Sequence, residues 1–253
     1  MNLAISVITG LGFIALFFGQ TDPANAPVIK VWTARAIATV LAEVGPQFER
    51  TTGYKLAVSS DLPTGFARRA NAGEPFDVLI SGSAPVDEWI KDGKIIAETR
   101  ADIARSGIGV EVRAGARKPD VSSVEAFKRA LLEAKSIAYL MAGTSGPYLQ
   151  SLFEHLGIAA ELQAKSHRPE TDTVGDLVAQ GDADMGITAI ATLHATRGVD
   201  VVGPIPSAIQ SYVCFEGAVS ANTTFPDIAR DLIEYLTGPS ALHAIKLNGM
   251  ESW

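Results

Sequence analysis

The chain has 253 residues, of which 47% are hydrophobic and 19% are charged, and its formal net charge is −7. A chain of this length and composition can bury a sizeable core, and its low charged fraction excludes an intrinsically disordered protein. The basic residues are scattered, which argues against a nucleic-acid-binding surface. The single cysteine, Cys214, excludes an intrachain disulfide and is expected as a small buried side chain in a strand.

The first 26 residues have the form of a secretory signal peptide. Leu3–Phe18 carries no charge, and Ala24–Ala26 has the small-x-small pattern of a cleavage site. The apolar run is short for a membrane span, although an uncut leader would leave the protein anchored to the membrane. We therefore predict that residues 1–26 are a signal peptide that directs export to the periplasm.

Strands and helices alternate in the stretch that follows. Glycines after the apolar-periodic segments are typical of helix ends, and the run "FDVLISGS" is typical of a central parallel strand. The alternation predicts βαβ units in an α/β fold. The expected strands are residues 28–32, 54–60 and 76–83, and the expected helices are residues 36–51, 66–73 and 84–93.

A second set of strands and helices of similar size occupies the middle of the chain, and a strand and two helices close it. Expected strands cover residues 106–115, 135–140, 199–206 and 211–220, with a short one within 173–193, and expected helices include 122–134, the end of 143–157 and two within 225–249. Two such sets predict two lobes, each a mainly parallel sheet flanked by helices, with a cleft between them. We expect the chain to cross from one lobe to the other near Gly107 and to return near Ser211. Residues 27–107 and 212–253 would then form lobe 1, and residues 108–211 would form lobe 2.

The joints between strands and the helices after them are rich in hydroxyl groups and glycine. In open α/β proteins ligands bind at such joints, where backbone N–H groups and helix N-termini favour an anion. The same hydroxyl groups would also serve as helix caps, and Tyr148 would serve equally well in a core. The candidate ligand-binding residues are Thr33, Arg35, Thr64, Ser81, Thr144, Ser145, Gly146, Tyr148, Thr173 and Thr188.

Arg35 is the one cation at these joints. It stands between the expected strand at residues 28–32 and the expected helix at residues 36–51. A guanidinium there can hold a carboxylate through two parallel hydrogen bonds, whereas the alternative is an arginine that points to solvent.

No metal or cofactor site is predicted. The four histidines lack the spacing of metal ligands, and the chain has no nucleophile elbow, phosphate-binding lysine loop or paired-cysteine motif.

Several segments together resemble the periplasmic molybdate-binding proteins of ABC importers. They include "VWTARAI", "GTSGPYLQSLFEHLGI", "QGDADMGI" and, as the most specific pattern, Ala-Gly-x-Pro-x-Asp-x-x-Ile-Ser at residues 72–81. The resemblance implies a class II solute-binding protein whose two lobes are joined by a two-strand hinge. It also implies a monomer that delivers a small anion to an importer in the membrane. Arg35 and Asp61 stand where the family has serines, which favours an organic anion over molybdate.

The run at residues 106–139 is similar to a divergent branch of the same superfamily, which includes periplasmic aconitate isomerases. This resemblance implies a second hypothesis, an isomerase that interconverts trans- and cis-aconitate by moving an allylic proton. Such chemistry needs a base near the substrate and cations on its carboxylates. The candidate bases are His167, Asp61 and Asp172, and Arg35 is the candidate carboxylate clamp. Between the two hypotheses, a binding protein is preferred because it requires no base.

Overall fold

The computed structural model describes residues 26–141, 145–171 and 173–252. The expected signal peptide, apart from residue 26, and two candidate site residues, Thr144 and Asp172, lie outside these ranges. Within the described part of the chain, no helix is long and apolar enough to cross a membrane.

The strands form one mixed sheet with parallel groups at its two ends. Their order is β2-β1-β3-β9-β4-β7-β5-β6, and β8 also pairs with β4. β1 is parallel to β2 and β3, and β5 is parallel to β6 and β7, whereas β4 and β9 are antiparallel to their neighbours. The strands are β1 Val28–Thr33, β2 Lys55–Ser60, β3 Val78–Ser81, β4 Ala101–Arg113, β5 Ile137–Ala138, β6 Ser166–His167, β7 Met185–Ala189, β8 Val199–Pro204 and β9 Tyr212–Val219.

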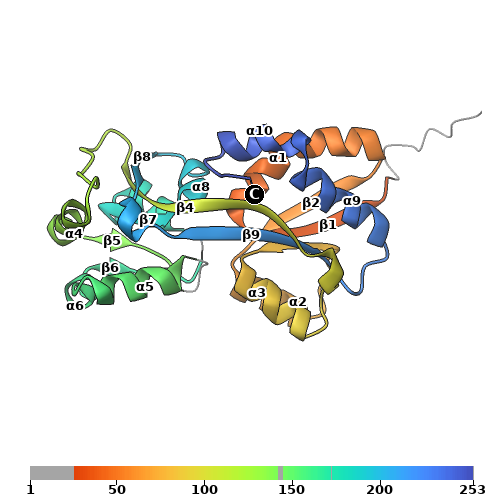
Figure 1. Ribbon diagram of the computed structural model, residues 1–253, viewed down its shortest axis with the longest axis horizontal. Coiled ribbons are helices and arrows are strands. Elements are labelled where there is room, and N and C mark those ends of the chain that lie inside the picture. The colour runs from red at the N-terminus through yellow and green to blue at the C-terminus, as the bar shows by residue number, and fades with distance from the viewer. Residues whose placement is uncertain (1–25, 142–144, 172, 253) are drawn as a thin grey trace, which may run out of the picture.

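The expected α/β fold is therefore present, but the two separate sheets that we expected are joined into one. The reason is the length of β4, which has 13 residues and runs with β9 along the middle of the molecule (Figure 1). β4 pairs with β9 from Ala101 to Gly107, and from Ile108 onward with β7 and, from Gly109, with β8. The expected crossing near Gly107 coincides with this change of partners, while the division into lobes stays a prediction.

The side chain of Gln210 joins the strands at this change of partners. Its Oε1 accepts hydrogen bonds from the N–H groups of Ile108 (2.8 Å) and Ser211 (2.9 Å). Its Nε2 donates to the carbonyl of Ile108 at 3.0 Å. The amide thus satisfies backbone groups at the point where β4 leaves one partner for the next.

Helices cover both faces of the sheet at the β1 end of the molecule. In Figure 1, α1, α9 and α10 lie on one side of the sheet and α2 and α3 on the other, while α4, α5 and α6 gather at the opposite end. The helices are α1 Arg35–Thr52, α2 Pro63–Asn71, α3 Ser83–Lys91, α4 Val124–Glu133, α5 Gly146–His155, α6 Ala159–Gln163, α7 Val174–Gln180, α8 Ile190–His194, α9 Pro226–Thr237 and α10 Pro239–Leu247.

Side chains of β1 alternate between the two cores at its end of the sheet. Ile29 and Val31 belong to the core under α1, α9 and α10, and Trp32 belongs to the core with α2 and α3. The guanidinium of Arg69, in α2, lies 4.1 Å from the centroid of the Trp32 ring and donates to Ser59 Oγ at 3.0 Å. Arg69 thus fastens α2 to the ends of β1 and β2, and so positions the loop between β2 and α2.

Asp77 explains the acidic position of the pattern at residues 72–81. Its carboxylate is buried and accepts from the N–H of Lys30 at 2.7 Å and from Thr223 Oγ1 at 2.6 Å. These bonds tie the start of β3 to β1 and to the loop after β9. The residue that carries most of the family resemblance is therefore part of the frame of the sheet.

Candidate functional site

A small polar cavity brings together three segments that are far apart in the sequence. Its volume is about 190 Å³. The segments are the start of α1, the loop between β2 and α2, and the residues just before α7. We call it the Arg35 cavity, and its lining residues are Arg35, Ser60, Asp61, Leu62, Thr171 and Thr173.

Arg35 supplies the positive charge of this cavity. It is the first residue of α1, and its side chain is 33% exposed, so it is neither buried in a core nor free in solvent. Its Nη2 lies 3.8 Å from Asp176 Oδ2, in the first turn of α7. At this distance the pair is an ion pair without a close hydrogen bond, and it places the guanidinium between the start of α1 and the start of α7.

Asp61 places a negative charge in the same cavity. Its Oδ1 accepts from the N–H of Leu62 at 2.8 Å. Gly65, one turn into α2, leaves the space for this carboxylate, because a Cβ there would lie 2.1 Å from Asp61 Oδ1 and 2.2 Å from Oδ2. The loop and the helix are therefore built around an acidic side chain at this position.

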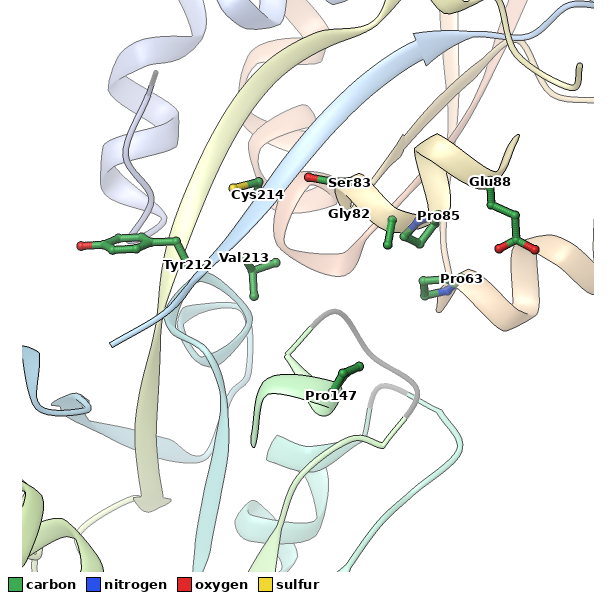
Figure 2. Close-up of a pocket in the computed structure, with 10 residues that line it drawn as sticks. Pro63, Gly82, Ser83, Pro85, Glu88, Pro147, Tyr212, Val213 and Cys214 are labelled. Carbon is green, nitrogen blue, oxygen red and sulfur yellow. The ribbon is translucent and has the colours of Figure 1, made fainter. Parts of the chain in front are cut away.

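A larger cavity lies on the other side of the Leu62–Pro63 start of α2. Its volume is about 410 Å³, and we call it the proline cavity. Figure 2 shows Pro147, at the start of α5, standing across the space from Pro63 and Pro85. Glu88 is the one charged residue on its wall. The lining residues are Pro63, Gly82, Ser83, Ala84, Pro85, Glu88, Pro147, Tyr212, Val213 and Cys214.

Cys214 borders the proline cavity from β9 and is partly exposed, which differs from the fully buried side chain that we expected. Burial and the nearby carboxylates of Glu216 and Asp102 raise the pKa of its thiol. The thiol is therefore protonated near neutral pH and is a weak nucleophile.

Backbone amides at the Arg35 cavity are not occupied by capping side chains. Ala34 precedes α1 and Thr173 precedes α7, and neither has a side-chain cap hydrogen bond in the described structure. By contrast, Ser123 caps α4, away from both cavities, by accepting from Ala126 N at 3.1 Å. The starts of α1 and α7 therefore differ from the start of α4 in having no side-chain cap.

Seven of the predicted ligand-binding residues line neither cavity, namely Ser145, Gly146 and Tyr148 at the start of α5 and Thr33, Thr64, Ser81 and Thr188. Thr33, Ser81 and Thr188 are buried at the carboxyl ends of their strands, and Thr33 Oγ1 donates to the carbonyl of Ala34 at 3.4 Å. Thr64 is exposed in the first turn of α2. These residues surround the joints that we identified, but their hydroxyl groups are not on the described cavity walls.

The start of α5 places Tyr148 against a core, which is one of the two roles expected for it. Gly146 is required there because a Cβ would lie 2.3 Å from the carbonyl oxygen of Met141, and Ser145 is buried beside it. The hydroxyl of Tyr148 donates to the carbonyl of Ile209, and its ring packs against the core formed with α5 and β7. Burial raises the pKa of this phenol. Tyr148 therefore anchors α5 in this structure rather than facing the Arg35 cavity.

Among the three candidate bases, the structure places Asp61 in the Arg35 cavity. His167 is exposed in β6, at the edge of the sheet, where sequence reasoning expected a loop. Asp172 lies outside the described residues. Within the described residues, no cluster of three or more His, Cys, Asp or Glu side chains could hold a metal ion.

Sequence reasoning missed two contributors to the site. Thr171 lines the Arg35 cavity and Asp176 pairs with Arg35. Thr171 lies within the polar run "KSHRPETDT" and Asp176 follows it, and the lack of apolar residues in this run was the available signal. Their contact with the start of α1 depends on the arrangement of the sheet, which the sequence alone does not provide.

Comparisons with known proteins agree with one another. A profile of the family described as bacterial extracellular solute-binding protein matches residues 29–251. An aconitate isomerase from a Pseudomonas species is 33% identical over 229 residues, which are 88% of this chain and 87% of that protein. A molybdate-binding protein from Azotobacter vinelandii is 24% identical over 235 residues, covering 89% and 90% of the two chains.

A solved structure agrees with the described fold. The periplasmic molybdate-binding protein of Azotobacter vinelandii superposes with a TM-score of 0.74 at 20% sequence identity, covering 88% of this chain and 98% of that one.

Proposed function

This chain belongs to the family of bacterial extracellular solute-binding proteins, and we propose that it captures a small organic anion, a di- or tricarboxylate, in the Arg35 cavity. The observation that supports this proposal is the convergence of Arg35, Asp61 and Thr173 from three distant segments on one polar cavity. A cavity assembled from distant segments is typical of a ligand site, because each segment contributes a different group to the same molecule.

The chemistry of the cavity favours a carboxylate. The planar guanidinium of Arg35 matches the two oxygens of a carboxylate, and the hydroxyl groups of Thr171 and Thr173 can donate to the oxygens of the same ligand. A hydrogen bond to a charged group contributes about 1.5–3 kcal/mol, which corresponds to roughly 10- to 150-fold in affinity. Such a bond is one contribution among several, because micromolar binding requires about 8 kcal/mol in total.

We further propose that the two ends of the sheet are lobes that close on the ligand. In this proposal residues 27–107 and 212–253 form one lobe, residues 108–211 form the other, and β4 and β9 form the hinge. Arg35 and Asp61 then contact the ligand from one lobe and Thr171 and Thr173 from the other. A ligand that touches both lobes only in the closed state shifts the population toward closure, and a membrane importer of the ABC type would recognise that state.

Calorimetric titration of residues 27–253 tests the binding function. The ligands are molybdate, sulfate and a panel of di- and tricarboxylates. We expect at least one carboxylate to bind, and Arg35→Ala to weaken its affinity roughly 100-fold because the charge and the two hydrogen bonds are lost together. Arg230→Ala, which removes an exposed arginine of α9, is the matched control and should leave affinity unchanged. Absence of binding to every ligand, or equal affinity in the Arg35→Ala variant, would contradict the proposal.

A second function is favoured by a specific observation, the 33% identity to an aconitate isomerase. In this alternative Arg35 holds a carboxylate of aconitate and Asp61 takes the proton that moves during the allylic shift. Incubation with trans-aconitate, followed by chromatography for the cis isomer, tests it. Turnover that Asp61→Asn abolishes would establish the enzyme, and absence of the cis isomer would leave binding as the function.

A further inference from the structure

Asp61 is an unusual residue to find in a cavity for an anion, and the structure shows that its place is built into the fold. Its Oδ1 is held by the N–H of Leu62, and the glycine at position 65 leaves just enough room for the carboxylate above the first turn of α2. A side chain at position 65 would displace it. The acidic group therefore lies at the wall of the Arg35 cavity, in the space that Gly65 leaves open.

Among the described residues, one positive and two negative charges surround the cavity, so their sum is −1. Arg35 is the cation among the described lining residues, and it is opposed by Asp61 on the wall and by Asp176 at 3.8 Å. A ligand that is fully deprotonated and carries only acceptor atoms gains from Arg35 and is repelled by Asp61. Molybdate, sulfate and plain polycarboxylates belong to this class.

A ligand that carries a hydroxyl group beside a carboxylate can interact favourably with both Arg35 and Asp61. Its carboxylate can occupy the guanidinium of Arg35 while its hydroxyl donates to Asp61, and this O–H···O⁻ hydrogen bond is charge-assisted. The hydrogen bond that Leu62 N–H donates engages Oδ1 alone, and among the described residues it is the one hydrogen bond that the Asp61 carboxylate accepts. Oδ2 is therefore able to accept from a ligand.

We infer that Asp61 is a specificity-determining residue that selects 2-hydroxycarboxylates over oxyanions and over carboxylates without a hydroxyl group. This inference rests on the proposed binding function of the Arg35 cavity. A site that must satisfy a charged acceptor discriminates strongly against ligands that lack the donor, because the acceptor is then desolvated without a partner.

Two pairs of ligands that differ by one hydroxyl group test the inference by calorimetry. They are citrate with tricarballylate, and malate with succinate. In whichever pair binds, we expect the wild-type protein to have roughly 10-fold or greater affinity for the hydroxylated ligand than for the ligand without the hydroxyl. Asp61→Asn keeps an acceptor for Leu62 N–H but removes the charge, so it should reduce that preference to less than about 3-fold and tighten binding of the member without a hydroxyl.

Asp176→Asn is the matched control, because it removes the same charge from the other side of Arg35. It should change both affinities of a pair by the same factor and leave their ratio intact. A wild-type ratio near one, or a ratio that Asp61→Asn does not change, overturns the inference while Arg35→Ala still establishes the proposed binding function. If the proposed binding function itself is wrong, the result is different, because Arg35→Ala then leaves every measured affinity unchanged.

Discussion

The Arg35 cavity and the proline cavity share one wall, the Leu62–Pro63 start of α2, but their linings differ in chemistry. The smaller one, of about 190 Å³, contains a guanidinium, a carboxylate and three hydroxyl groups. The larger one, of about 410 Å³, has prolines on three sides, and the charged residue on its wall is Glu88. For an anionic ligand, charge and donors outweigh volume, so the smaller cavity is the better candidate site although the larger one offers more room.

The largest effect that would test this comparison is expected from Arg35→Lys. The substitution keeps one positive charge but replaces the planar fork by an ammonium group, which cannot make two parallel hydrogen bonds. We expect the affinity for a carboxylate ligand to fall about 10-fold, against roughly 100-fold for Arg35→Ala. Calorimetry with the ligand found in the panel measures both values. Equal losses in the two variants would show that the fork geometry, and not the charge, decides binding.

A smaller effect is expected when the proline cavity is filled. Ala84 is exposed on its wall, so Ala84→Trp adds bulk to the cavity without disturbing a core. If the ligand is confined to the Arg35 cavity, the affinity should change by less than about 3-fold, because no contact of the ligand is altered. The same titration reports it. A loss comparable to that of Arg35→Lys would mean that the ligand extends past α2 into both cavities.

The smallest effect is expected when ligand is added during alkylation of Cys214, where the measured quantity is the reaction rate of the thiol. Because the thiol pKa is raised by burial, its reaction with iodoacetamide should be slow at pH 7 and should accelerate as the pH rises, since the thiolate is the reactive form. Saturating ligand should change this rate by less than about 2-fold if the proline cavity stays empty. Mass spectrometry of time points at several pH values measures the rate. Strong protection by ligand, with unchanged pH dependence, would place the ligand against β9.

The order of helices and strands was predictable from sequence because local signals mark it. Gly53 ends α1 in a left-handed conformation, with φ of 77°, as the glycine signal at helix ends predicts, and Ser123 caps α4. Boundaries were less accurate. α2 begins at Pro63, three residues before the expected Phe66, because Pro63 at the first helical turn extends the helix into the loop that carries Asp61. The two-residue strand β6 was missed, since so short a strand has no periodicity.

The candidate site was predictable only in part. Arg35 and Thr173 were identified from their place at strand-to-helix joints, and the structure puts both on one cavity. The same reasoning also selected Thr33, Ser81 and Thr188, which are buried. A joint identifies the end of a strand, but which of its two or three polar residues faces the ligand depends on the twist of the sheet and on the start of the helix. Contacts such as Arg35 with Asp176 require the tertiary structure.

The position of β9 in the sheet has a consequence for the order in which the molecule is made. β9 lies between β3 and β4, although it is the last strand in sequence. During synthesis β3 and β4 therefore emerge without the strand that joins them, and the centre of the sheet cannot form until the ribosome has passed Val219. Since the final pairings span more than a hundred residues, the nascent chain stays open for most of translation.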